Sequence, residues 1–215
     1  MTHFAALVIT PHRPDEDEMG RVLWPWCYNN PDALDPWYDW LRIGGRFEGA
    51  LDPDWTHEGC KPVRDSSQRR KRDLDSAALG RQAEDHKAAL YDRIEAALAG
   101  RKIPDIERLT RQHGEEDGRR RFDTDPAVQA VQSVAGHLWR ENIVQLSRPR
   151  EVVLARARRL ALVTSAVVSG GEWHASELFN LDEDPARTEI WVELFERVVA
   201  RAAPDDWLTV VDCHR

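Results

Sequence analysis

Short apolar runs lie at both ends of the chain, and a long polar stretch separates them. Residues 3–10 (HFAALVIT), 160–169 (LALVTSAVVS) and 207–213 (WLTVVDC) each have the length and composition of a buried strand. The stretch between them, 63–158, carries apolar residues at three- and four-residue steps, as helices do. Strands and helices in separate runs predict an α+β fold and exclude a regular βαβ alternation.

We therefore expect an antiparallel-rich sheet with one helix packed on a face. That helix is predicted over Ala186–Ala202, after the capping pair Asp184-Pro185, and Gly170-Gly171 predicts a tight hairpin before it. The predicted division has three parts: 1–62 (N-terminal strands and an aromatic-rich segment), 63–158 (a helical insertion) and 159–215 (the strands and helix that complete the core). Within the insertion, residues 112–123 are charged and aperiodic, and we expect a mobile loop there.

The charge balance argues against some classes of partner. The chain has 38 acidic and 30 basic residues, a formal net charge of −8, whereas proteins that bind duplex DNA usually present a basic face. The basic runs 69–72 and 119–121 are bordered by acids, so we interpret them as solvated surface. No apolar run approaches the about 18 residues of a membrane span, and the first residues predict a strand, not a signal peptide. Neither duplex nucleic acid nor a membrane is expected as a partner.

The three cysteines, Cys27, Cys60 and Cys213, are an odd and widely spaced set, which favours a reducing bacterial cytoplasm over a secreted disulfide framework. Only His57 with Cys60, and Cys213 with His214, are close in sequence. A zinc site usually needs two tight pairs, so no metal site is expected. Walker A, GxGxxG and HExxH patterns are absent from the sequence, and it does not indicate a cofactor.

Pairs of polar residues that point to the same side of a strand, on three predicted strands, form the candidate site. Arg42 aligns with Arg46 around the flexible pair Gly44-Gly45, Glu172 with His174, and Asp212 with His214. If those strands are neighbours, guanidiniums, imidazoles and carboxylates share one sheet face. The candidate ligand-binding residues are Trp40, Arg42, Gly44, Gly45, Arg46 and Trp173; the candidate catalytic residues are His174, His214 and Asp212.

The chemistry of these residues leaves several functions open. Arginines grip phosphate or carboxylate, tryptophans stack on aromatic groups, and a histidine oriented by Asp212 or Glu172 shuttles protons. A solvated sheet face with cross-strand charge pairs has the same composition. We expect either a protein that binds a small anionic, nucleotide-like or phosphorylated ligand, or a hydrolase or transferase at the same cleft. An acidic module that binds and inhibits a host protein is the third hypothesis, and whether the chain is an enzyme stays open.

Three short segments carry a family resemblance. The segment Asn30–Gly49 (NPDALDPWYDWLRIGGRFEG) resembles the "NP…WDWY-x-IGGRW-x-G" segment of an uncharacterised family of small proteins from bacteriophages and actinobacterial genomes. The segments GEWH (171–174) and VDCH (211–214) are similar to later motifs of that family. The chain departs from the pattern at Leu41 and Phe47, and by ending in Arg215. The resemblance implies a phage or mobile-element accessory protein and no particular activity.

Overall fold

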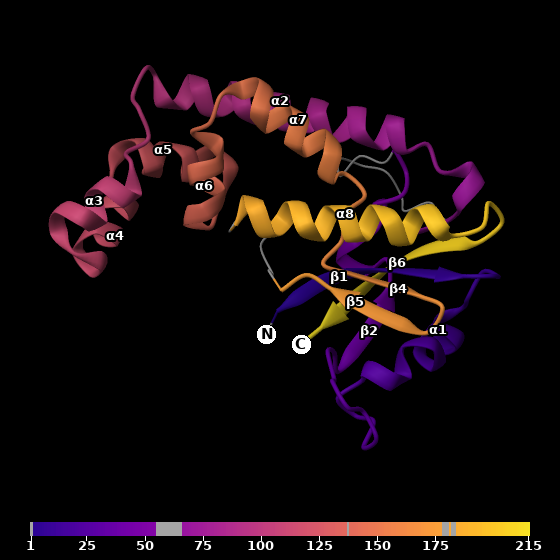
Figure 1. Ribbon diagram of the computed structural model, residues 1–215. Helices are drawn as coiled ribbons and strands as arrows, with labels where there is room; N and C mark the ends of the chain where they lie inside the picture. Colours follow the sequence, from indigo (N-terminus) through magenta and orange to yellow (C-terminus); the bar gives the residue numbers. More distant parts are fainter. Residues whose placement is uncertain (1, 55–65, 137, 178–180, 182–183) are drawn as a thin grey trace. The chain divides into compact units, whose positions relative to one another are not determined.

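A computed structural model describes residues 2–54, 66–136, 138–177, 181 and 184–215 of the chain (Figure 1). In that part of the chain, eight α-helices and a mixed sheet of six strands form the α+β fold that the sequence predicts. The chain divides into two compact units: Met1–Leu79 with Leu160–Arg215, and Gly80–Arg159. The helical unit begins 17 residues later than the predicted insertion at 63. Residues 66–79 belong to the first unit, because strand Gln68–Arg70 pairs into its sheet.

The first unit is built on one sheet. Its strands are β1 (His3–Thr10), β2 (Trp40–Ile43), β3 (Gln68–Arg70), β4 (Ala166–Ser169), β5 (Glu172–Ala175) and β6 (Trp207–His214). The order across the sheet is β2-β6-β1-β4-β5, and β3 pairs with the first half of β6 on the same edge as β2. Most neighbours are antiparallel, and only β1 with β4 is parallel. The first and last strands are therefore central, and Figure 1 shows the two termini close together.

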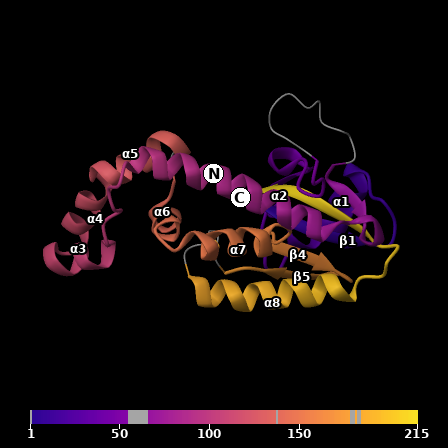
Figure 2. The same cartoon turned by 90° about the horizontal axis from the view of Figure 1, so that it is seen from above.

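One face of this sheet is covered by α8 (Pro185–Arg201) (Figures 1 and 2). Its start is capped by Asp184, whose carboxylate accepts hydrogen bonds from the amides of Ala186 and Arg187. Trp191 and Phe195 pack against alternate residues of β1 and β6, such as Leu7 and Val210. The helix predicted over Ala186–Ala202 is thus confirmed to within a residue at each end.

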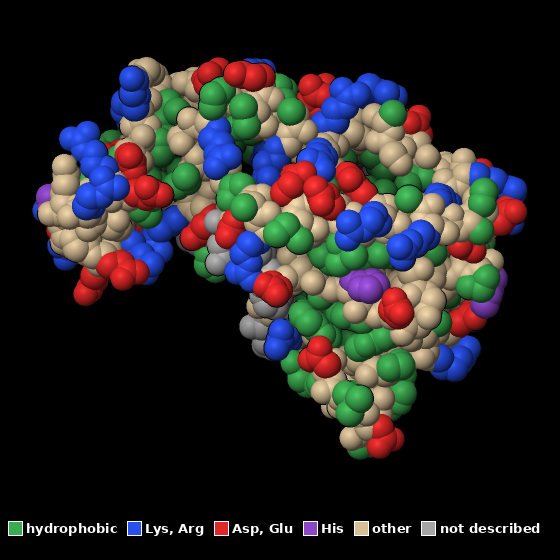
Figure 3. Space-filling model, viewed as in Figure 1, with side chains coloured by type: hydrophobic (Ala, Val, Ile, Leu, Met, Phe, Trp, Pro, Cys, Tyr) green, Lys and Arg blue, Asp and Glu red, His purple; other side chains and the backbone are tan. Residues whose placement is uncertain are grey.

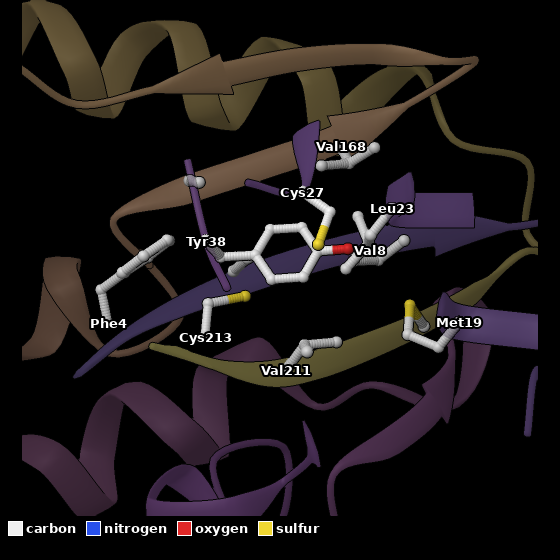
Figure 4. Packing of buried hydrophobic residues seen from close by; sticks show 11 residues of the cluster. Phe4, Val8, Met19, Leu23, Cys27, Tyr38, Val168, Val211 and Cys213 are labelled. Carbon is white, nitrogen blue, oxygen red and sulfur yellow. The ribbon is translucent and has the colours of Figure 1, made fainter. Parts of the chain in front are cut away.

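The opposite face is covered by α1 (Glu16–Leu23), the short 3-10 helix η1 (Trp24–Trp26) and the aromatic segment after it. Their buried core includes Met19, Leu23, Cys27 and Tyr38 (Figure 4). The Tyr38 ring lies among this cluster with its hydroxyl toward Cys27. Part of the aromatic segment, Tyr38 and Trp26, therefore serves this core, whereas Trp24, Tyr28 and Trp40 are exposed.

The strand predicted to carry both Arg42 and Arg46 ends before Arg46. β2 ends at Ile43, and the backbone then turns through Gly44 into the 3-10 helix η2 (Gly45–Phe47). Leu41 and Ile43 pack on the α1 side of the sheet, but Phe47, which would share their face on a continuous strand, packs on the α8 side. The turn at the glycine pair breaks the alternation that parity arguments assume.

The second unit contains helices around its own core. Its helices are α2 (Ser76–Leu98, whose first turn belongs to the other unit), α3 (Ile106–His113), α4 (Glu115–Asp123), α5 (Pro126–Ala135), α6 (Arg140–Leu146) and α7 (Arg150–Leu160, with its last residue in the other unit). Their buried residues include Ile94, Phe122, Val128, Val131 and Ile143. Positive and negative side chains alternate over its surface in Figure 3.

The loop expected at 112–123 is wrong, because most of it is α4. The charges that hide its periodicity form ion pairs one turn apart, between Glu115 and Arg119 and between Asp117 and Arg121. A single apolar side chain, Phe122, is fully buried and anchors the helix. The next helix, α5, begins after Asp125, whose carboxylate accepts a hydrogen bond from the Ala127 amide.

No helix among the described residues is both long enough and apolar enough to cross a bilayer.

Candidate functional site

The sheet register aligns chemically active side chains from three neighbouring strands. Trp40 of β2 lies opposite His214 of β6, which lies opposite His3 of β1. Two residues further along, Arg42 lies opposite Asp212. Because side chains two apart share a sheet face, all five belong to the face that α8 covers. The first and last strands of the chain thus meet at one end of the sheet.

Asp212 is the buried centre of this group, only 1% exposed. Its Oδ1 lies 2.8 Å from Nδ1 of His3, and its Oδ2 accepts a hydrogen bond of 3.0 Å from the backbone amide of Arg46. Both carboxylate oxygens are therefore satisfied by the protein, as a buried charge requires. With Nδ1 of His3 facing the carboxylate, Nε2 is the nitrogen left for other chemistry.

The glycine pair makes this arrangement possible. Gly45 has a φ of +53°, and a Cβ there would lie 2.5 Å from the Asp212 side chain; a Cβ on Gly44 would lie 2.5 Å from Ser67 Oγ. The Gly44 amide donates to the carbonyl of Val210. The sequence predicts Gly44 and Gly45 as ligand-binding residues, but here their missing side chains make room for Ser67 and Asp212, and the Gly44 amide is used within the sheet.

A second imidazole–carboxylate pair lies beside the first. His214 Nδ1 is 2.6 Å from Oδ1 of the exposed Asp39. The rings of His3 and His214 have centroids 5.0 Å apart. The ring of the half-exposed Trp40 forms a T-shaped pair with His3, with 6.1 Å between the ring centroids. Both histidines are partly accessible, with side chains 19% and 17% exposed. Two oriented imidazoles this close are suited to proton transfer at one bound group.

Two arginines border the pair of histidines. Arg42 lies on the edge strand β2, and Arg46 lies in η2 directly after the glycines; both side chains are exposed. Among the described residues neither guanidinium has a carboxylate within ion-pair distance, including Asp212, which bonds Arg46 through the backbone only. The two cations are therefore available to an anionic ligand.

A cavity of about 340 Å³ opens beside His3. Its walls come from β1 and β6, from the end of η2 and the turn after it, from the loop before β4, and from Leu181 in the segment before α8. Apart from His3 the lining is chiefly apolar, and includes Phe47, Ala50, Leu51, Leu162, Val163 and Val210. The volume is at the lower end of the range for small-molecule sites.

The structure does not bring Glu172 and His174 into this group. Both residues lie on the α8 face, since His174 is opposite Val167, which packs in the core on that side. However, β5 is the edge strand farthest from β2. Three inter-strand steps separate it from β6, which is about 14 Å. His174 Nε2 lies 3.5 Å from Glu172, its neighbour on the same strand.

Trp173 points to the other face of the sheet. Its ring packs on Trp37, at 5.9 Å between centroids, and on Trp26, at 5.5 Å. This tryptophan is part of the α1-side core and does not share a face with Trp40. Of the predicted residues, Trp40, Arg42, Gly44, Gly45, Arg46, Asp212 and His214 therefore gather at one place, and Trp173 and His174 do not.

Sequence reasoning missed His3 and Asp39. His3 points to the same side of its apolar strand as Ala5 and Leu7. That position predicts which sheet face the histidine lies on, but not which residues of a neighbouring strand it contacts. The available signal was a histidine at the start of the first strand together with Asp212 and His214 at the end of the last. Antiparallel pairing of those two strands makes them neighbours, but the sequence does not show which strands pair.

The buried thiols and the phenol of the α1-side core have a different character. Burial raises the pKa of Cys213 far above its ordinary value, and nearby Asp212 adds to the effect. Burial likewise raises the pKa of Tyr38, with Cys27 and Cys213 contributing. A thiol that stays protonated is a poor nucleophile, so we assign Cys213 to the core. Cys27 and Cys213 are both free.

In the described part of the chain, no three His, Cys, Asp or Glu side chains cluster in a way that would hold a metal ion. The sequence grouping of His57 with Cys60 lies outside the described residues. Cys213 and His214 point to opposite faces of β6, because they are adjacent on a strand.

Comparisons of the chain with protein-family models, with curated proteins and with solved structures give no match.

Proposed function

We propose that this protein binds a small phosphate-bearing ligand at the His3–His214 pair and hydrolyses a phosphoester bond in it by general acid–base catalysis. The observation that supports this most is the pairing itself. Two imidazoles lie 5.0 Å apart, and each has its Nδ1 held by its own carboxylate. Nε2 of each ring is then oriented for proton transfer at one group, as acid–base catalysis requires.

The environments of the two histidines suggest separate roles. His3 is held at Nδ1 by the buried Asp212, which fixes the direction of its Nε2, and we assign it as the base. His214, held by the exposed Asp39, serves as the acid. Arg42 and Arg46 neutralise the phosphate, and Trp40 offers a flat face to the leaving group.

The reaction balances with water as the nucleophile. His3 Nε2 takes a proton from water as its oxygen attacks phosphorus, the phosphorus–oxygen bond to the leaving group breaks, and His214 Nε2 gives a proton to the departing oxygen. The products are an alcohol and a phosphate with one ester bond fewer. Exchange with solvent then returns His3 to its neutral form and His214 to its protonated form.

The test is turnover of two phosphodiesters, methyl p-nitrophenyl phosphate and methyl phenyl phosphate. Phenolate is the poorer leaving group and depends more on the acid. We expect His3→Gln to slow both reactions by 10²–10⁴-fold, the range for loss of one acid–base group, and His214→Gln to slow the phenyl ester more than the nitrophenyl ester. His86→Gln, an exposed helical residue, is the matched control. Equal rates in wild type, His3→Gln and His214→Gln would refute the assignment.

Arg46→Ala isolates the contribution of the guanidinium. The backbone amide that holds Asp212 stays in place in this variant, so ligand affinity falls while the fold remains. Unchanged affinity for phosphate ligands would contradict the arginine clamp and favour the third hypothesis, an acidic surface that binds a host protein.

The cellular setting that we propose is the cytoplasm of a bacterial host, as an accessory protein of a phage or mobile element. The resemblance of segments 30–49, 171–174 and 211–214 supports that setting, as does the odd cysteine count.

A further inference from the structure

We infer that the phosphate ligand of this site carries an apolar group, which occupies the cavity beside His3. The inference names the substrate class of the proposed function and rests on it. The cavity has about 340 Å³, and His3 is the only one of its lining residues that also belongs to the histidine pair. His3 therefore connects the two places, and a substituent on a phosphate held at His3 can reach this cavity.

The cavity is held open by the fold. Its wall from residues 161–165 is fixed by hydrogen bonds, because Trp191 Nε1 donates to the carbonyl of Thr164 at 2.9 Å and the Ser165 amide donates to the carbonyl of Ala5. Ala5, Ala50 and Ala161 line it with small side chains. These small side chains, on a backbone held by hydrogen bonds, line a space that the described residues leave open.

The walls of this space favour an apolar occupant. The polar side chain of Thr164 is turned to the carbonyl of Ala166, at 2.6 Å, and the carbonyl of Ser165 accepts from the amide of Ser176. The Thr164 hydroxyl and the Ser165 carbonyl are thus engaged within the protein. What remains toward the cavity is chiefly the apolar surface of residues such as Phe47, Leu162 and Val163, which binds alkyl or aryl groups by desolvation.

The size of the cavity sets the size of the group. A buried apolar cavity of about 150 Å³ holds benzene, and this one has about 340 Å³. An alkyl chain of roughly four to eight carbons, or one to two aromatic rings, therefore fits. The substrate class is an amphiphilic phosphoester, with its phosphate between the histidines and arginines and its apolar group beyond His3.

Binding of alkyl phosphates tests this without requiring turnover. We would titrate methyl, butyl and hexyl phosphate and measure affinity by calorimetry. Each methylene buried in the cavity strengthens binding by about fourfold, so hexyl phosphate should bind at least a hundredfold more tightly than methyl phosphate. Ala50→Leu and Ala161→Leu, two independent ways to fill the cavity, should bring that ratio close to one. Ala203→Leu, at an exposed position in the same unit, should keep it.

The outcomes separate this inference from the proposed function. Equal affinity for all three phosphates, no binding, or a ratio that survives both filling variants would overturn the cavity assignment. A chain-length dependence that Ala50→Leu or Ala161→Leu abolishes supports it. If hexyl p-nitrophenyl phosphate then binds without being hydrolysed, the proposed catalysis fails while the apolar site stands.

Discussion

His3, in the first strand, and Asp212, in the last, are joined by a hydrogen bond of 2.8 Å between Nδ1 and Oδ1, although 209 residues separate them in sequence. They are diagonal neighbours on the α8 face, since His3 is registered with His214 and Ala5 with Asp212. The same contact that orients an imidazole also ties the two ends of the chain together. Substitutions here therefore affect both stability and the proposed chemistry.

Asp212→Asn should lower the free energy of unfolding by about 1.5–3 kcal/mol, the range for a hydrogen bond to a charged group. The amide of Asn supplies one acceptor where the carboxylate supplies two, for His3 and for the Arg46 amide. Urea unfolding followed by circular dichroism measures the change. Asp39→Asn, which alters an exposed partner, is the control and should cost less than about 1 kcal/mol; equal losses would contradict the central role of Asp212.

Gly45→Ala should destabilise the protein by roughly 2–4 kcal/mol, because a Cβ adds both backbone strain and a clash. Gly45 has a φ of +53°, and its added Cβ would meet Asp212 at 2.5 Å. Gly171→Ala is the matched control, since Gly171 has a φ of +80° with nothing within 4 Å of an added Cβ. Its loss should be limited to about 1–2 kcal/mol of strain. Thermal unfolding gives the melting temperatures of the two variants. Similar melting temperatures would contradict the close approach of Gly45 to the Asp212 side chain.

Stability should decrease at alkaline pH because of the buried thiol and phenol. The unfolded chain releases the Cys213 proton near the ordinary pKa of 9.0 and the Tyr38 proton near 10.0, whereas burial raises both in the folded protein. The unfolded state therefore binds fewer protons, by the Cys213 proton above pH 9 and also by the Tyr38 proton above pH 10, and each group then lowers the stability by about 1.4 kcal/mol per pH unit. Denaturant titrations from pH 7 to 11 measure the slope. Tyr38→Phe should flatten it above pH 10, and an unaltered slope would contradict this origin.

Phe122→Ala should destabilise the helical unit by about 3–5 kcal/mol, the cost of deleting a fully buried phenyl ring. Arg119→Gln, which removes an exposed ion pair of the same helix, should cost about 0.3–0.5 kcal/mol. Helical ellipticity during urea unfolding reports both values. If the two variants unfold alike, α4 is not anchored by Phe122.

The local structure of this chain is largely readable from its sequence. The strand at 3–10, the hairpin at Gly170-Gly171 and the helix after Asp184-Pro185 follow from apolar runs, turn glycines and a capping carboxylate, all interactions between near neighbours. The helix α4 was not predicted, because its stabilising ion pairs and its one buried phenylalanine do not produce an apolar periodicity. Interactions between near neighbours are therefore sufficient to predict a single helix, strand or turn where its apolar residues follow the usual periodicity.

What brings the candidate site together is strand order, and tertiary structure alone decided it. Parity aligned Glu172 with His174 and Asp212 with His214 within their own strands, but strand order put β6 between β1 and β2 and placed β5 at the far edge. His3 thereby joined the site and His174 left it. Parity is a property of each strand's own backbone, whereas neighbourhood in a sheet depends on packing between strands about 200 residues apart, which minimises exposed apolar surface over the whole core. The sequence by itself therefore determined which residues could share a face, and the fold determined which of them meet.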